Sequence, residues 1–87
     1  MKLIEMYTRP DCVYSKAAKQ LLNDNELKFV EYDIYVNPEY VLEMRRRTTN
    51  KTYPQIFIDG KSIGGYEDLL VLQRQGLLDL SEGREAG

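Results

Sequence analysis

The chain has 87 residues with a single cysteine, no histidine and a formal net charge of −2, so one small domain is expected. The lone cysteine excludes a disulfide-stapled secreted fold and favours a reducing, cytoplasmic location, and the missing histidine excludes Ser–His and Cys–His catalysis. The charge gives no basic field for nucleic acid, and the chain shows no membrane-spanning apolar run and no signal-peptide pattern, so neither nucleic acid nor membrane is an expected partner.

The N-terminal part of the chain predicts a strand followed by a helix. Lys2 to Thr8 is rich in β-forming residues, and Arg9-Pro10-Asp11 ends this strand. From Cys12 to about Asn25, apolar residues recur with the spacing of one helix face, and Asp11 is the expected N-cap. The side chains expected to face inward are Val13, Ala17, Ala18, Leu21 and Leu22.

A second strand and a second helix follow. Lys28 to Ile34 predicts the strand, in which Phe29 and Val30 are the positions expected to be buried. Asn37 before Pro38 predicts the helix start, with asparagine as the cap and proline at the first helical position. We expect this helix to run from Pro38 to about Arg47.

The remainder predicts a hairpin, a third helix and a tail. Gln55 to Ile58 and Lys61 to Ile63 are short strands joined by Asp59-Gly60, the strongest two-residue hairpin signal in the chain. Tyr66 to about Gln75 predicts the helix, which the glycine at position 76 ends. Residues 81–87 are expected to form a flexible tail.

The order of these elements is strand, helix, strand, helix, strand, strand, helix. A helical crossover between the first two strands implies that they are parallel, and the hairpin adds an antiparallel pair. The expected fold class is therefore α/β, a four-stranded mixed sheet flanked by three helices in the thioredoxin-like arrangement.

Cys12 lies where the first predicted strand ends and the first predicted helix begins. Free backbone N–H groups and the helix dipole favour an anion at such a position, and thiolate is the reactive form of cysteine. Arg9, three residues upstream, is close enough to add to this effect. Position alone leaves a second interpretation open, an inert buried thiol, because free cysteines are among the most buried residues.

Three motifs occur in order on the predicted elements. They are Cys12-Val13-Tyr14-Ser15, Thr52-Tyr53-Pro54, and Gly64-Gly65 followed by Glu67-Asp68. With their flanking residues they resemble the glutaredoxin family over nearly the whole chain, and a glutaredoxin domain is expected over residues 1–80. The resemblance implies a monomeric oxidoreductase that uses glutathione and acts on glutathionylated or disulfide-bearing proteins, with Cys12 as the nucleophile.

The resemblance also implies how glutathione is bound. Pro54 would be cis and would turn the backbone of Tyr53 toward the ligand, the alternative being an ordinary proline at a strand start. The helix start at Gly65, Tyr66 and Glu67 would hold a glutathione carboxylate through its N–H groups. Glu67 or Asp68 would meet the ammonium group, the alternative being acids that only complement the helix dipole.

Three further side chains carry expectations from the same resemblance. Arg9 would face the other glutathione carboxylate, and Tyr14 would line the site beside the sulfur or simply pack on its helix. Arg47 would be a solvated helix end, with a glutathione carboxylate as the alternative partner. The expected glutathione-binding residues are Arg9, Tyr14, Thr52, Tyr53, Pro54, Gly65, Tyr66 and Glu67.

Ser15 stands at the position of the second cysteine of dithiol glutaredoxins, either naturally or as a replacement. Serine cannot resolve a mixed disulfide, so only a monothiol route through Cys12 is open. A homodimeric [2Fe–2S] carrier, ligated by Cys12 and one glutathione from each chain, is the alternative function. The Val13-Tyr14 pair resembles dithiol sites rather than the Gly-Phe of the monothiol class, and this favours the oxidoreductase; no other metal site is expected.

Overall fold

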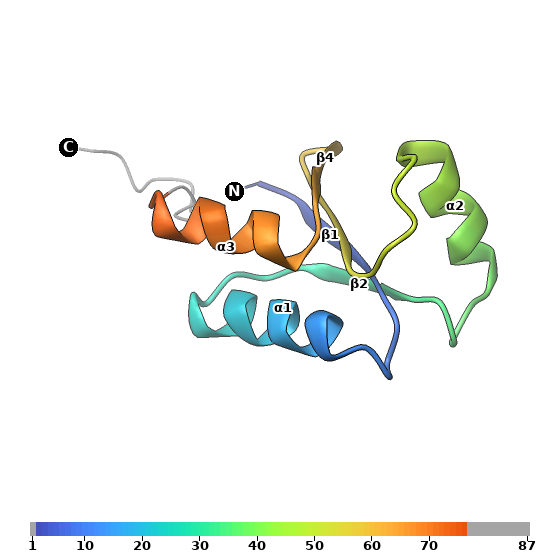
Figure 1. The fold of residues 1–87 in the computed structure, drawn as a ribbon, viewed down its shortest axis with the longest axis horizontal. Coiled ribbons are helices and arrows are strands. Elements are labelled where there is room, and N and C mark those ends of the chain that lie inside the picture. Colours follow the sequence, from blue (N-terminus) through green and yellow to red (C-terminus); the bar gives the residue numbers. More distant parts are fainter. Residues whose placement is uncertain (1, 77–87) are drawn as a thin grey trace.

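The elements of the computed structural model, which describes residues 2–76, follow the predicted order (Figure 1). The strands are β1 (Ile4–Thr8), β2 (Val30–Asp33), β3 (Gln55–Ile58) and β4 (Lys61–Gly64), and the helices are α1 (Val13–Asp24), α2 (Glu39–Arg47) and α3 (Tyr66–Arg74). The expected α/β, thioredoxin-like architecture is confirmed. The predicted tail, 81–87, lies outside the described residues.

The sheet has the strand order β2-β1-β3-β4. β1 pairs in parallel with β2, as the helical crossover predicts, and antiparallel with β3. β3 and β4 form the predicted hairpin, whose turn residues Asp59 and Gly60 have φ angles of 51° and 82°. Both angles lie in the left-handed region that a type I′ turn requires, so the Asp-Gly pair suits this connection.

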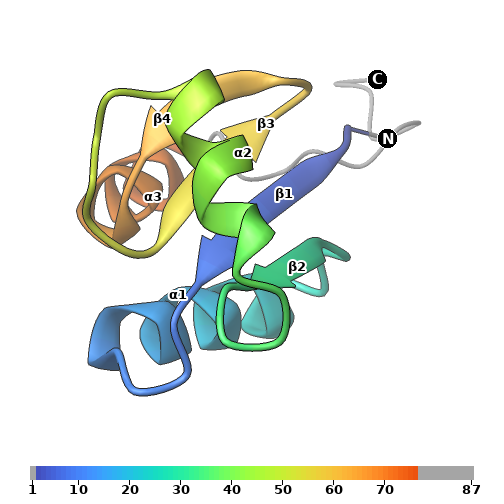
Figure 2. The same cartoon turned by 90° about the vertical axis from the view of Figure 1, so that its right-hand side faces the viewer.

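Alternation along β1 sends its side chains into two separate cores. Ile4 and Met6 pack toward α1 and α3, in a core that also contains Leu22, Ile56 and Leu69. Tyr7 lies on the opposite face, in a core with Met44 of α2 and Phe57 of β3. Figure 2 shows the resulting layers, with α2 on one side of the sheet and α1 and α3 on the other.

Two predicted core positions are exposed. Val13 is 74% exposed because it lies two residues before the buried Ser15, and residues two apart on a helix point in nearly opposite directions. Val30 is 42% exposed because it lies on the edge strand, on the face that α2 covers only in part. Its neighbour Phe29 does pack against the larger core, as predicted.

The start of α1 also differs from the prediction. The N-cap is Cys12, in extended conformation, and no side chain caps this helix end. Asp11 lies one residue too early to serve, and its carboxylate contacts Arg9 and Tyr35 instead. At α2 the N-cap is Pro38 rather than the predicted Asn37, although the Asn37 Oδ1 still accepts the N–H of Glu39 at 3.1 Å. None of the helices within residues 2–76 has both the length and the apolar character needed to cross a bilayer.

Candidate functional site

Cys12 is partly exposed at the N-terminus of α1. Its backbone N–H donates to the Arg9 carbonyl at 3.1 Å, which closes the tight turn between β1 and the helix. Its thiol donates to the carbonyl oxygen of Tyr53 at 3.5 Å, across 41 positions of sequence. The sulfur therefore lies between the free N–H groups of a helix start and the backbone of the loop that precedes β3.

The loop before β3 is held in place by a buried glutamine. The Tyr53–Pro54 peptide bond is cis, as the resemblance implied, and Pro54 is buried. The Nε2 of Gln55 donates to the Thr52 carbonyl at 2.8 Å and to the Thr52 hydroxyl at 3.0 Å. Its Oε1 accepts a longer bond, 3.5 Å, from the amide of Asn50. Gln55 thus fixes the course of the backbone that faces Cys12.

The start of α3 forms the opposite wall. An oxygen of Asp68 accepts the N–H of Gly65 at 2.9 Å. This bond corrects one expectation, because the Gly65 N–H is already engaged and the donors left for a ligand belong to the following residues of the first turn. Gly65 also lies against the neighbouring loop, since a Cβ added to it would be 3.3 Å from the Pro54 carbonyl oxygen.

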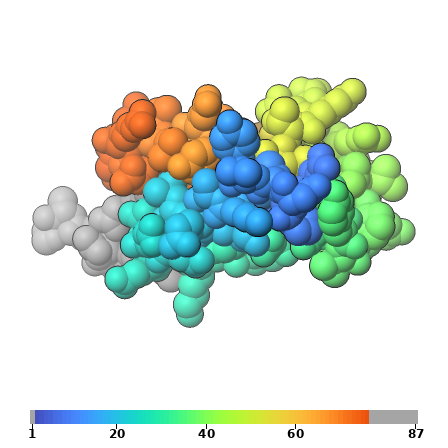
Figure 3. Space-filling view, turned by 60° about the horizontal axis from the view of Figure 1, so that its bottom comes forward, coloured from blue at the N-terminus to red at the C-terminus, as the bar shows by residue number. Residues whose placement is uncertain are grey.

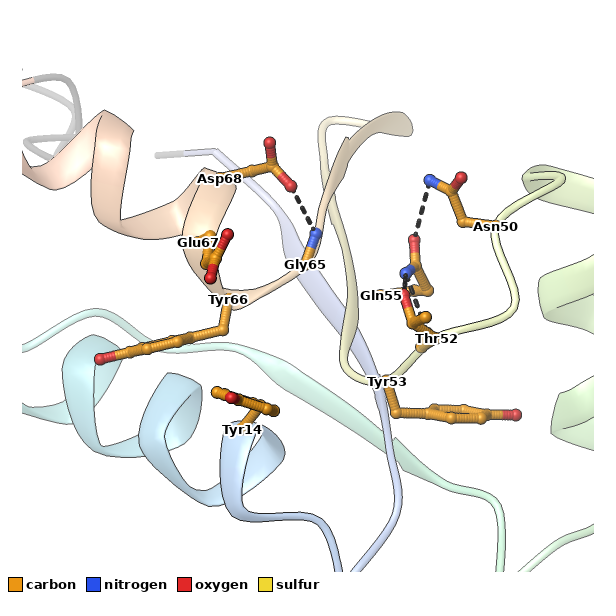
Figure 4. A pocket seen from close by; sticks show the side chains of 9 residues that line it. All are labelled: Tyr14, Asn50, Thr52, Tyr53, Gln55, Gly65, Tyr66, Glu67 and Asp68. Atoms are coloured by element: carbon orange, nitrogen blue, oxygen red, sulfur yellow. Dashed lines mark hydrogen bonds between the residues drawn. The ribbon is translucent and has the colours of Figure 1, made fainter.

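These walls enclose an open cavity of about 440 Å³. Figure 4 shows its lining side chains, which come from the start of α1, the loop before β3 and the start of α3. The lining residues are Tyr14, Asn50, Thr52, Tyr53, Gln55, Gly65, Tyr66, Glu67 and Asp68. The same three segments, blue, yellow and orange, meet on one face of the molecule in Figure 3. The volume falls within the range of small-molecule sites.

Two tyrosines line the side of the cavity nearest the α1 and α3 helix starts. The rings of Tyr14 and Tyr66 lie 6.1 Å apart between centroids, at an interplanar angle of 31°. Tyr14 remains 57% exposed, so its ring faces the cavity and solvent rather than a core. The expectation that Tyr14 lines the site therefore agrees with its position, whereas simple helix packing does not.

Arg9 lies on the far side of Tyr53. Its guanidinium carbon is 5.9 Å from the Tyr53 ring centroid and 6.0 Å from that of Tyr35. Its Nη2 contacts the Tyr35 hydroxyl at 3.3 Å and the Asp11 carboxylate at 3.4 Å. The hydrogen bond with Tyr35 and the charge of Asp11 raise the pKa of Arg9, whose guanidinium is cationic at neutral pH.

Ser15 is buried beside the turn between β1 and α1, with 1% of its surface exposed. Its hydroxyl accepts the backbone N–H of Arg9 at 3.3 Å. The side chain at the second position of the Cys-x-x-Ser motif thus supports the turn that carries Arg9 and Cys12.

Arg47 is not part of this site and is not a solvated helix end. Its guanidinium binds both carboxylate oxygens of Glu5, at 2.9 and 3.2 Å, and the Tyr7 hydroxyl at 3.0 Å, on the α2 face of the sheet. The guanidinium carbon also lies 4.0 Å from the Phe57 ring centroid. Hydrogen bonds from Arg47 hold the pKa of Glu5 below its ordinary value. The alternative glutathione contact of Arg47 is therefore wrong for this arrangement.

Of the predicted residues, the cavity is lined by Tyr14, Thr52, Tyr53, Gly65, Tyr66 and Glu67, whereas Cys12, Arg9 and Pro54 are not among its lining residues. Cys12 adjoins the cavity through its contact with the Tyr53 carbonyl. Asn50 and Gln55 were missed. Gln55 had a detectable signal, a polar residue beginning an otherwise apolar strand directly after the proline motif, whereas nothing local marks Asn50. Within residues 2–76 no group of three or more metal-ligating side chains is assembled, and the [2Fe–2S] alternative, which needs only Cys12 from each chain, stays a prediction.

Comparisons with known proteins agree with this geometry. The glutaredoxin family model matches residues 4–63. Glutaredoxin 3 of Escherichia coli K12 is 42% identical over 79 residues, which is 91% of this chain and 95% of that protein. The solution structure of glutaredoxin from Brucella melitensis superimposes with a TM-score of 0.73 at 42% identity, covering 88% of this chain and 84% of that one.

A more distant neighbour shares the fold alone. The buckwheat glutaredoxin–glutathione complex has a TM-score of 0.79 at 21% identity and covers 88% of this chain and 73% of that one.

The family match spans the strand and helix that carry Cys12 and the loop with the cis proline. This chain belongs to the glutaredoxin family of thiol oxidoreductases.

Proposed function

We propose that this protein is a glutathione-dependent thiol–disulfide oxidoreductase that acts through Cys12 alone. The observation that carries the proposal is the position of the Cys12 sulfur, at a helix start, 3.5 Å from the Tyr53 carbonyl oxygen and beside a cavity sized for a short peptide. The chain contains no second cysteine, so an intramolecular disulfide cannot form.

The reaction then proceeds in two thiol–disulfide exchanges. The Cys12 thiolate attacks the glutathione sulfur of a glutathionylated protein, the protein–glutathione S–S bond breaks, and the protein leaves as a thiolate that takes up a proton. A second glutathione, as its thiolate, attacks the glutathione sulfur now bound to Cys12. Oxidised glutathione leaves, and the Cys12 thiolate is regenerated.

The cavity offers a partner for each part of the tripeptide. The backbone of Tyr53 would pair with the cysteinyl residue, as an added strand does. N–H groups at Tyr66 and Glu67 would hold the γ-glutamyl carboxylate, and the Glu67 carboxylate would meet its ammonium group. Arg9, on the far side of the Tyr53 ring, would face the glycine carboxylate.

Remaining contacts would come from the two other predicted residues of the cavity. The Tyr14 ring would cover the sulfur side of the ligand, and Thr52 would lie against it from the loop before β3. The buckwheat neighbour is a complex with glutathione, which supports a ligand of this class in this fold. We further propose that the protein works as a monomer in the cytoplasm, because one chain supplies the complete groove and one free thiol needs a reducing compartment.

Steady-state kinetics with a glutathionylated peptide test the proposal. If glutathione and the peptide are varied together, double-reciprocal plots should be parallel, because the enzyme is itself glutathionylated between the two half-reactions. The variant Cys12→Ser is expected to be inactive, and Ser15→Ala to retain turnover. Turnover by Cys12→Ser, or intersecting plots, would contradict the mechanism.

A further inference from the structure

The turn that follows β2 presents an exposed tyrosine to the loop between β1 and α1, residues 9–12, here called the active-site loop. Tyr35 is 56% exposed and belongs to neither hydrophobic core. Its backbone is nevertheless fixed, because the Asp33 carboxylate accepts the Tyr35 N–H at 2.8 Å. The next residue back, Ile34, donates its N–H to the Thr8 carbonyl at 3.1 Å. A tyrosine so held has a defined direction without contributing to the core.

The Tyr35 side chain closes a triangle with two residues of the active-site loop. Its hydroxyl donates to Asp11 Oδ2 at 3.2 Å and accepts from Arg9 Nη2 at 3.3 Å, while Arg9 and Asp11 are 3.4 Å apart. Its ring centroid lies 6.0 Å from the Arg9 guanidinium carbon, which is also 5.9 Å from the ring centroid of Tyr53. Each contact is long and weak, but together they restrict a side chain that is otherwise free to rotate.

Apart from Tyr35, the residues around Arg9 do not fix its guanidinium in place for a ligand. The Arg9 Nε is buried without a hydrogen-bond partner among residues 2–76, so it does not anchor the guanidinium. Asp11 is a competing carboxylate for the same cation, with its side chain 58% exposed. By donating to Asp11, the Tyr35 hydroxyl engages that oxygen, and the Nη1 donors of Arg9 remain available to a ligand.

We propose that Tyr35 is a positioning residue that holds the Arg9 guanidinium beside Tyr53 for the carboxylate of glutathione. The inference rests on the proposed function, because it assumes that Arg9 meets this carboxylate. In this proposal Tyr35 acts through Arg9 and does not itself bind the ligand. Its ring and its hydroxyl make separable contributions.

A set of variants tests the inference through KM for a glutathionylated peptide. Tyr35→Phe keeps the ring and should raise KM about twofold, and Tyr35→Ala should raise it about three- to fivefold, with kcat unchanged in both. Val36→Ala, at the adjacent and 78% exposed position, is the matched control and should leave KM unchanged. In an Arg9→Ala background, Tyr35→Ala should have no further effect.

Other outcomes overturn the inference. If Tyr35→Ala leaves KM at the wild-type value, or raises it equally in the presence and absence of Arg9, Tyr35 does not act by positioning that side chain. A fall in kcat with KM unchanged would likewise contradict it. Failure of the underlying function is distinguishable, because the wild-type protein itself would then not turn over the peptide.

Discussion

Replacing Arg47 with methionine should reduce stability strongly while leaving glutathione binding intact. The side chain of Glu5 is 12% exposed and that of Arg47 is 27% exposed, so the change leaves a nearly buried carboxylate without its cationic partner. Removing one partner of a fully buried pair costs about 3–5 kcal/mol, and partial access of water reduces the expected loss here to about 2–3 kcal/mol. Methionine keeps an apolar chain over Phe57, so the loss reports the charge rather than a cavity.

The measurement is urea unfolding of Arg47→Met beside Arg46→Ala, whose exposed site should change the free energy of unfolding by less than about 0.5 kcal/mol. The pH dependence adds a check. Since the folded-state pKa of Glu5 is lowered, its stabilising contribution is complete above the ordinary value of 4.5 and is lost as pH falls through the folded-state pKa. The difference between Arg47→Met and wild type should therefore shrink in acid. A loss below about 1 kcal/mol at neutral pH would contradict the expected cost of leaving Glu5 unpaired. A raised KM for the glutathionylated peptide would contradict the placement of Arg47 outside the site.

Three further predictions concern the site itself. Arg9→Ala should slow deglutathionylation by less than about tenfold, because an exposed ion pair is worth only about 0–1 kcal/mol, and the rate loss should shrink in high salt. A large, salt-insensitive loss in the steady-state rate would indicate a buried ion pair instead. Gly65→Val should lower the rate of deglutathionylation more than Arg9→Ala does, because even a Cβ at position 65 would lie 3.3 Å from the Pro54 carbonyl oxygen. A rate loss equal to or smaller than that of Arg9→Ala would contradict this ranking. Ser15→Ala should lower the free energy of unfolding by about 1 kcal/mol, since the Arg9 N–H loses its buried acceptor, and an unchanged urea midpoint would show that this bond is unimportant.

Local patterns were sufficient to predict the elements because each element carries its own signal. The Asp59-Gly60 turn requires positive φ at both residues, and Asp and Gly are residue types that adopt this conformation readily. Burial at the ends and edges of elements was harder to predict. Val13 and Val30 are apolar, yet one lies opposite the buried face of α1 and the other on an edge strand, and these facts depend on tertiary packing.

The candidate site divides in the same way. The three motifs located Cys12, the loop at Pro54 and the α3 start, because each is a local feature of a helix start or a strand start. The cis state of Pro54 was implied by the resemblance to glutaredoxins, not by the motif itself. Partners distant in sequence were not predictable from such features. The pairing of Arg47 with Glu5 spans 42 positions, and a run of three arginines contains nothing that distinguishes the one that is bound.

The monothiol glutathione mechanism at Cys12 can be tested by intact-protein mass spectrometry after incubation with oxidised glutathione. We expect one glutathione adduct per chain, located on Cys12 by peptide mapping and removed completely when reduced glutathione is added. Cys12→Ser should acquire no adduct under the same conditions. A wild-type protein that remains unmodified, or an adduct that reduced glutathione does not remove, would contradict a monothiol glutathione mechanism at Cys12.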